Sequence, residues 1–169
     1  MLGQLGVEAF RYHRWANLHI LDVCAGLSDE QLELTAQGTY GTVAATLMHL
    51  LAAEQRYIWR LTGDEPKFRE TDGFPGVDRL KERAAQSGDR LIAIAAEVDP
   101  DEEFEAEFSD GRQRLRKGVV MLQAIHHGND HRTHICTVLG HHGIAYGDMD
   151  VWAYGEAIGA IRWAQPDAC

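Results

Sequence analysis

Four histidines lie within nine consecutive residues of one otherwise apolar segment, MLQAIHHGNDHRTHICTVLG, at 121–140. Four residues of α-helix advance by about 400°, so side chains at that spacing point the same way within about 40°. His127 and His131 have this spacing and share a face with the apolar Ala124 and Ile135. An unsatisfied polar group on such a buried face costs roughly 1 to 3 kcal/mol. We therefore predict that His127 and His131 have a bonding partner, and a single metal ion can bind both rings.

A third histidine lies in a second apolar segment. His49 stands in a run without charge from Val43 to Ala53, and a helix that is apolar nearly all round is surrounded by protein. A lone histidine there is more often a hydrogen-bonded core residue, but a pair at spacing four favours a shared metal. Three neutral imidazoles with an exchangeable water form a recurring zinc site, and imidazole also suits nickel, iron, copper and cobalt. The sequence predicts one divalent ion, zinc favoured, held by His49, His127 and His131.

Several neighbours of this pair are candidates for catalysis. His134 shares the face, so it can be a fourth ligand, a group that orients a ligand, or a base. Asp130 can orient an imidazole or act as a base, and a solvated carboxylate is the alternative. Arg132 can receive a substrate carboxylate, and a solvated arginine is the alternative. His126 points about 100° away and is not expected to be a ligand.

Motifs for other chemistries are missing. A di-iron carboxylate bundle needs Glu-x-x-His on two helices, and no Glu here has a His three residues later. The patterns H-E-x-x-H, G-x-S-x-G, the Walker loop and G-x-G-x-x-G are also absent.

Glu54 falls on the apolar stripe of its helix, and a buried carboxylate is seldom unpaired, so we expect it to meet an Arg, Tyr or His from the first helix.

Hydrophobic periodicity predicts the elements that position these residues. Apolar residues recur every three or four positions in four long segments, whose expected helices cover 5–23, 39 or 42–61, 77–98 and 116–139. Glycines 26, 63 and 140 are expected to end three of them. Alternation in EFEAEFSDGRQRLRKG predicts a hairpin-like excursion, GDEPKFRETDGFPG predicts a loop, and a short helix is expected near the C-terminus. The fold class is therefore all-α, a four-helix bundle with long connections.

Composition limits the partners. The chain has 169 residues, enough for one domain over 1–169, and 16 basic against 26 acidic residues give a formal charge of −10. This charge repels nucleic acid and anionic lipid, and no 18-residue apolar stretch exists. Three cysteines without a C-x-x-C spacing favour a reducing cytoplasm.

Three segments together resemble a known superfamily. YHRWANLHILDVCAGLSDEQL, GTVAATLMHLLAAEQRYIWRL and AIHHGNDHRTHICTVLGHHG are similar, in order and spacing, to the signature segments of the DinB-like superfamily, which includes the YfiT-like thiol transferases. The resemblance implies an up-down-down-up bundle, often a homodimer, with one metal ion held by His49, His127 and His131. Two departures are His126, where the family has Asn, and Thr133-His134, where Gly-Gln is common.

The resemblance also implies a function. Relatives with known activity use a low-molecular-weight thiol for S-transfer or isomerisation. Their metal favours the thiolate, which is the nucleophilic form of the thiol. We therefore expect a metal-dependent enzyme that joins such a thiol to an electrophilic substrate, with Tyr12 and Asn17 as candidates for lining the cofactor pocket. Two alternatives remain: metal-assisted hydrolysis, with Asp130 or His134 as base, and a non-catalytic metal-binding stress-response module.

Overall fold

The computed structural model describes residues 2–108 and 110–162. It contains four long helices, three short ones and one hairpin, and their bounds are α1 Leu2–Ala25, α2 Asp29–Leu32, α3 Val43–Thr62, η1 Glu70–Asp72, α4 Val77–Glu97, β1 Glu103–Phe108, β2 Gly111–Arg116, α5 Lys117–His141 and α6 Val151–Ala157.

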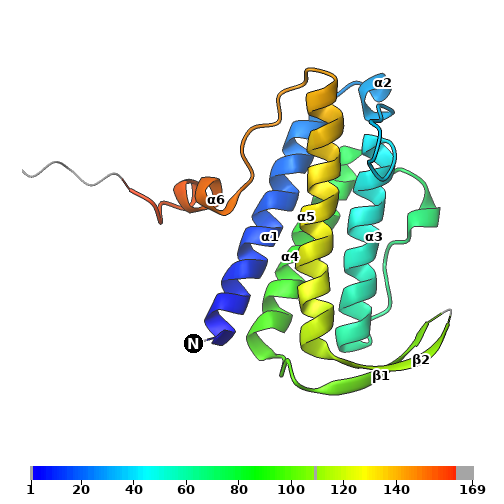
Figure 1. Ribbon diagram of the computed structural model, residues 1–169, viewed down its shortest axis with the longest axis vertical. Helices are drawn as coiled ribbons and strands as arrows, with labels where there is room; N and C mark the ends of the chain where they lie inside the picture. The colour runs from blue at the N-terminus through cyan, green and yellow to red at the C-terminus, as the bar shows by residue number, and fades with distance from the viewer. Residues whose placement is uncertain (1, 109, 163–169) are drawn as a thin grey trace, which may run out of the picture.

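The four long helices lie side by side (Figure 1). α1 packs most extensively on α4, and α3 packs on both α5 and α4. The chain between α3 and α4 runs back along the outer side of α3, and α6 lies beside α1, outside the bundle (Figure 1). A mostly helical fold is thus confirmed, although the term all-α omits a two-stranded sheet. Within the two described ranges, no helix combines the length and the apolar character that crossing a membrane requires.

Local signals set the ends of α3, the helix that carries His49. The Thr42 side chain accepts a hydrogen bond from Ala45 N (3.0 Å), which satisfies one of the free amides of the first turn. At the other end Gly63 has φ 80°, the left-handed conformation that closes a helix. Both ends agree with the sequence analysis, which named Thr42 as one of two possible starts.

α5 ends later than predicted. Gly140 is still helical, and the left-handed residue is Gly143, with φ 71°. Ile144 N donates to Leu139 O (2.9 Å) and Gly143 N to Gly140 O (3.1 Å), the pair of bonds of a Schellman motif. Leu139 is buried and Ile144 packs against the same core. This apolar contact commonly accompanies a Schellman motif, and it favours a helix end at Gly143 over one at Gly140.

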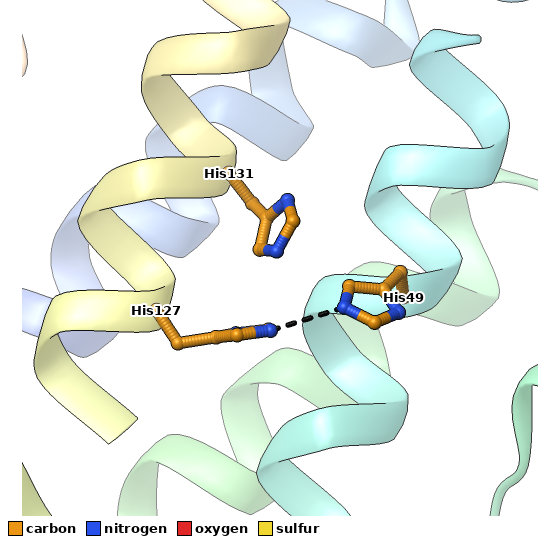
Figure 2. Close-up of side chains that lie close together, drawn as sticks. All are labelled: His49, His127 and His131. Carbon is orange, nitrogen blue, oxygen red and sulfur yellow. Dashed lines mark hydrogen bonds between the residues drawn. The ribbon is translucent and has the colours of Figure 1, made fainter. Parts of the chain in front are cut away.

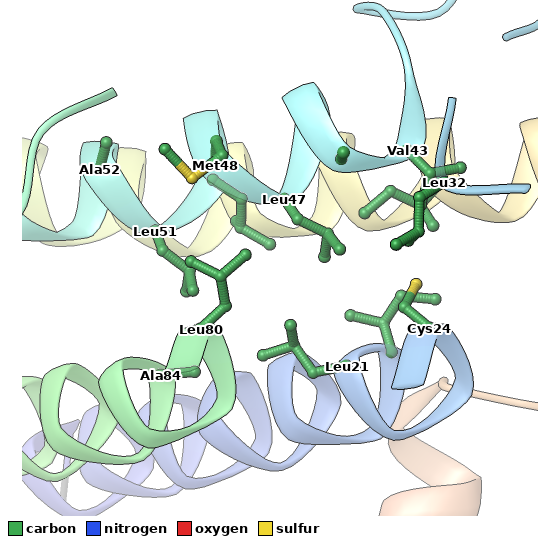
Figure 3. Packing of buried hydrophobic residues seen from close by; sticks show 14 of the residues in the cluster. Leu21, Cys24, Leu32, Val43, Leu47, Met48, Leu51, Ala52, Leu80 and Ala84 are labelled. Carbon is green, nitrogen blue, oxygen red and sulfur yellow. The ribbon is translucent and has the colours of Figure 1, made fainter. Parts of the chain in front are cut away.

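One core cluster lies between α1, α3, α4 and α5 at the end of the bundle near α2, and it is shown in Figure 3. A second cluster, from the same four helices, lies toward the other end. Leu21 and Cys24 of α1 face Leu47 and Leu51 of α3, and Leu80 of α4 completes the contact. All are at most 1% exposed. This packing fixes α3 in the bundle and thereby positions His49.

The predicted hairpin is confirmed. β1 and β2 pair antiparallel, and the register places Glu103 opposite Arg116 and Glu105 opposite Arg114. Opposite charges directly across a strand pair stabilise the sheet by roughly 0.2 to 1 kcal/mol each. The acidic and basic stretches that flank the turn are therefore the two partners of one ribbon, which joins α4 to α5.

Candidate metal centre

Three histidines from two helices converge where α3 and α5 pack together. His127 and His131 project from α5 toward His49 on α3, as Figure 2 shows. One ligand atom from each ring lies within 4.8 Å of the others. The ring centroids are 5.0 Å apart for His49 and His127, and 4.3 Å apart for His127 and His131. The three residues predicted as ligands are thus brought together.

The spacing of the nitrogens suits a metal ion. Nε2 of His127 lies 3.1 Å from Nε2 of His49. Two nitrogens bound at about 2.0 to 2.1 Å in a tetrahedral zinc site lie roughly 3.3 Å apart, so little movement is needed to bind a cation. Among the described residues, Nδ1 of His127 and Nδ1 of His131 have no hydrogen-bond partner. Three imidazole rings whose ligand atoms lie this close together can therefore hold one metal ion.

The remaining nitrogen of His49 is fixed by two residues from loops. Nδ1 lies 3.0 Å from Oε2 of Glu70 and 2.9 Å from the Tyr40 hydroxyl, which itself donates to Oε1 of Glu70 (2.8 Å). The Tyr40 ring also stacks on His49, with centroids 4.1 Å apart. In this arrangement Nδ1–H donates to Glu70, so the lone pair is on Nε2, facing the other two rings.

The electrostatics keep the two α5 rings uncharged and Glu70 charged. Burial, and then the neighbouring histidines, lower the pKa of His127 to about 3 and that of His131 to about 4. Partial burial raises the pKa of Glu70, but hydrogen bonds from Tyr40 and His49 outweigh it and hold that pKa below its ordinary value. Both α5 rings are therefore neutral at pH 7, the protonation state that binds metals.

The other candidates on α5 lie around this cluster. The His134 ring is half-buried and meets the His131 ring edge-on at 5.3 Å, but the histidine group with mutual ligand distances, among the described residues, does not include it. Asp130 is exposed, as is His126, which points away from the cluster as predicted. His134 and Asp130 therefore lie beside the site rather than within it.

Glu54 is the centre of a separate buried network. One of its oxygens lies 2.7 Å from Nε2 of His13 and accepts from Asn17 (2.5 Å), and the other accepts from Ser87. Glu54 and its partners His13 and Asn17 are at most 1% exposed. The carboxylate is thus paired with a histidine of the first helix, which is one of the partners predicted from its buried position.

Arg132 and Asn17 belong to this network and not to the metal cluster. The Arg132 guanidinium is 4% exposed and donates to Asn17 and to Asn129. Asn17 therefore links the charge of Arg132 to that of Glu54. Tyr12 lies on the same side of α5, where it lines a cavity of about 310 Å³ with Arg132. These three candidates therefore lie where α5 packs on α1, whereas the metal cluster lies where α5 packs on α3.

Gly128 allows α5 to approach α1 beside the cluster. A Cβ at this position would lie 2.3 Å from Cε1 and 2.8 Å from Nδ1 of His13. Any larger residue would push the helix away from α1. The glycine that follows the first α5 ligand thus sets the depth at which that ligand sits.

Tyr40 and Glu70 were not among the residues predicted for the site. Tyr40 lies at the predicted start of the second helix, placed at Thr39 or Thr42, and Glu70 lies in a segment predicted as a loop. Tyr40 lies two residues before Thr42, the N-cap of α3, and Glu70 is the first residue of η1. No periodic pattern marks such residues, because only the path of the loops over α3 brings them to the imidazole.

The comparisons with known proteins agree with this fold. A crystal structure of a DinB-like protein from Bacillus cereus matches with a TM-score of 0.65 at 16% sequence identity, over 85% of this chain and 94% of that chain. At this identity the likeness shows the fold alone. No curated protein matches the chain. The family model described as DinB family matches residues 1–165, nearly the whole sequence, and the chain therefore belongs to the DinB family.

Proposed function

We propose that this protein is a metal-dependent enzyme that activates a low-molecular-weight thiol and transfers it to an electrophilic substrate. The observation that supports it most directly is the open group of three imidazoles, His49, His127 and His131, whose ligand atoms lie within 4.8 Å of one another. Three protein ligands leave a tetrahedral ion with a position for an exogenous group, as in catalytic rather than structural sites. Zinc is the proposed ion, and nickel or iron suit the same donors.

The chemistry of S-transfer suits such a site. A bound divalent cation lowers the pKa of a thiol that reaches it and so favours the nucleophilic thiolate. The thiol releases its proton, a bond forms between sulfur and the electrophilic carbon, and the leaving group departs with the electron pair of its broken bond. His134 supports this scheme as a proton acceptor, because its buried Nδ1 has no hydrogen-bond partner within residues 2–108 and 110–162. Asp130 is the alternative acceptor, since it is exposed on the next turn.

A direct assay tests the proposal. Protein expressed without a His tag, loaded with zinc, is mixed with monochlorobimane and, in turn, with mycothiol, bacillithiol and cysteine. We expect zinc-dependent formation of the fluorescent adduct with at least one thiol, its loss in His127→Ala, and its retention in the matched control His126→Ala. Equal rates with and without zinc for every thiol would contradict thiol activation.

Two other outcomes point to the alternative functions. Zinc-dependent cleavage of esters or amides without added thiol would identify a hydrolase, in which the metal generates the nucleophile from water. A zinc-bound protein without either activity, in which His127→Ala only lowers the melting temperature, would identify a module in which the ion fastens α3 to α5.

We also infer an up-down-down-up order of the four long helices and a homodimer. The long connection that returns along α3 before α4 begins supports the order (Figure 1). Exposed apolar side chains on three helices support an association: Leu5 is 67% exposed, Leu122 69% and Trp152 74%. Light scattering of the parent and of Leu122→Gln would test it, because Leu5 and Leu122 line one apolar cavity, and a dimer formed through that surface is weakened by the substitution.

A further inference from the structure

A groove runs along the outer side of α3 and ends at Glu70, the residue that contacts Nδ1 of His49. It has a volume of about 540 Å³ and lies between α3 and the segment that follows it, residues 65–71. On the helix it is lined by Ala52 and Arg56, which follow His49 by three and seven residues and so continue its face. Its other wall includes Glu70, the residue that fixes His49. The groove and the cluster therefore share a boundary.

The register of the two walls gives the groove a direction. Lys67 N donates to Oε1 of Gln55 (3.2 Å), so residues 65–66 lie toward the C-terminal end of α3 and residues 69–71 toward His49. Trp59 and Pro66 form the distant end, and Phe68, which is 3% exposed, anchors the segment in the core. One end of the groove thus offers an aromatic and aliphatic surface, and the other end reaches Glu70, next to His49.

Two arginines provide the charge of the groove. Arg56 and Arg69 are exposed, and neither forms an ion pair with a carboxylate in the described part of the chain. Of the two glutamates in the lining, Glu70 is already engaged by Tyr40 and His49, and Glu65 lies at the distant end. In a chain of net charge −10, two free guanidinium groups at one site favour an anion.

The charge of Arg56 reaches the cluster itself. After burial and the charges of His131 and His49, it contributes to lowering the pKa of His127. Arg56 also acts to lower the pKa of Tyr40 and the pKa of Glu70, although other groups have larger effects on both. An anion held by Arg56 would therefore lie within electrostatic reach of the metal ligands.

We propose that this groove binds a small anionic molecule with an aromatic or aliphatic body, whose carboxylate or sulfonate contacts Arg56 and Arg69 while its body packs on Trp59 and Pro66. The volume is in the range of small-molecule sites, about 300 to 1,000 Å³. The assignment of this molecule as the electrophilic substrate rests on the proposed function. The binding itself depends only on the groove.

The test uses 1-naphthalenesulfonate as the probe and 1-naphthalenemethanol as its neutral counterpart. A sulfonate is a weak zinc ligand, so titration of zinc-free and zinc-loaded protein, followed by calorimetry and tryptophan fluorescence, reports on the groove. We expect the anion to bind about tenfold more tightly than the alcohol in both forms, because a hydrogen bond to a charged group contributes about 1.5 to 3 kcal/mol. Trp59→Leu should remove the fluorescence response.

Matched variants assign the site. Arg56→Gln should weaken the sulfonate about tenfold and leave the alcohol unchanged, and Arg56→Gln/Arg69→Gln should remove the preference for the anion. Arg79→Gln, an exposed arginine paired with Glu82 on α4, is the control and should bind like the parent. Leu122→Gln controls for the separate apolar cavity between α1 and α5.

The outcomes separate this inference from the proposed function. Equal affinity for the two probes, or sulfonate binding that Leu122→Gln abolishes and Arg56→Gln does not change, would overturn the anion site. Protein that binds the sulfonate through Arg56 but fails to bind zinc would support the site and refute the metal-dependent activity. Zinc binding without any preference for the sulfonate would refute the site alone.

Discussion

His49 is held more firmly than the two histidines of α5. Its Nδ1 contacts both Glu70 and Tyr40, and the Tyr40 ring stacks on its face. Nδ1 of His127 and of His131 lacks such a partner among the described residues. A metal-binding histidine usually donates its other N–H to a carboxylate or carbonyl, which fixes the ring and raises its basicity. We infer that the orientation of the site is set from the α3 side.

Removing the charge at Glu70 should weaken metal binding. Glu70→Gln leaves an oxygen near His49 but no negative charge, and we expect zinc affinity to fall about 10- to 100-fold. Tyr40→Phe removes the hydroxyl and keeps the ring, so a smaller loss is expected. Competition with a fluorescent chelator measures both.

Glu65→Gln is the control for these variants, since Glu65 lines the same groove without contacting His49. If Glu70→Gln and Glu65→Gln bound zinc equally well, the carboxylate at position 70 would have no role in holding the ligand.

Protonation of the α5 ligands links stability to pH. The pKa values of His127 and His131 in the folded chain, about 3 and 4, lie below the ordinary value of 6.5. As the pH falls through 6.5, the unfolded chain takes up protons that these buried rings exclude. Their contribution to stability is therefore complete above pH 6.5 and is lost progressively as the pH falls toward 4.

Thermal unfolding of zinc-free protein should show this dependence. We expect the melting temperature to fall between pH 7 and pH 4.5, and the fall to be shallower in His127→Ala/His131→Ala. His126→Ala, which changes an exposed ring, should keep the slope of the parent. An unchanged slope in the double variant would mean that other groups cause the pH dependence.

At the scale of elements, α5 is the helix on which both buried polar groups depend. One face carries the metal ligands toward α3, and another carries Arg132 toward Asn17 of α1. Because these polar contacts lie on different faces, polar residues are spread around α5 and its apolar face is weakly marked. Gly128 lies between them, and the contact of its backbone with the His13 ring determines how closely α5 approaches α1.

Gly128→Ala should therefore be destabilising although alanine favours helices. The added Cβ would lie 2.3 Å from the His13 ring, and overpacking of this kind costs about 1 to 3 kcal/mol. Gly140→Ala is the matched control on the same helix, because its Cβ would meet only the Tyr146 ring, at 3.4 Å. Helix propensity there predicts a gain of about 0.5 to 1 kcal/mol. Urea unfolding measures both, and equal effects would refute the close contact at Gly128.

At the scale of the molecule, the metal centre joins helices that are distant in sequence. Hydrophobic packing holds α3 against α1, α4 and α5 (Figure 3), and the three imidazoles form a further contact between α3 and α5 (Figure 2). A ligand that binds the folded chain alone stabilises it in proportion to the logarithm of its concentration. The ion is thus expected to add stability to a bundle that already has its own core.

Zinc should raise the melting temperature of this protein. At a zinc concentration 100 times Kd the gain is about 2.7 kcal/mol, or roughly 5 to 10 °C for a chain of this size. Scanning calorimetry with and without zinc measures the shift, and His49→Ala should abolish it. A shift of the same size in that variant would place the zinc elsewhere.

The sequence by itself determined the helices, most of their ends and the three histidines that converge. Spacing four within one helix aligns His127 with His131 regardless of tertiary context, and the apolar stripe around Glu54 marks it as buried. His49, expected to be enclosed as well, is half-buried. These signals are local, because they arise from helix geometry and from the composition of a few turns.

Only the tertiary structure decided what surrounds the ligands. Tyr40, Glu70 and the Arg56 groove come together because two connections fold over α3, and no periodic pattern records the path of a connection. For the same reason Tyr12, Asn17 and Arg132, predicted as candidates near the metal, instead meet where α5 packs on α1. A helix face is encoded by spacing, whereas the neighbour of that face depends on how the whole chain packs.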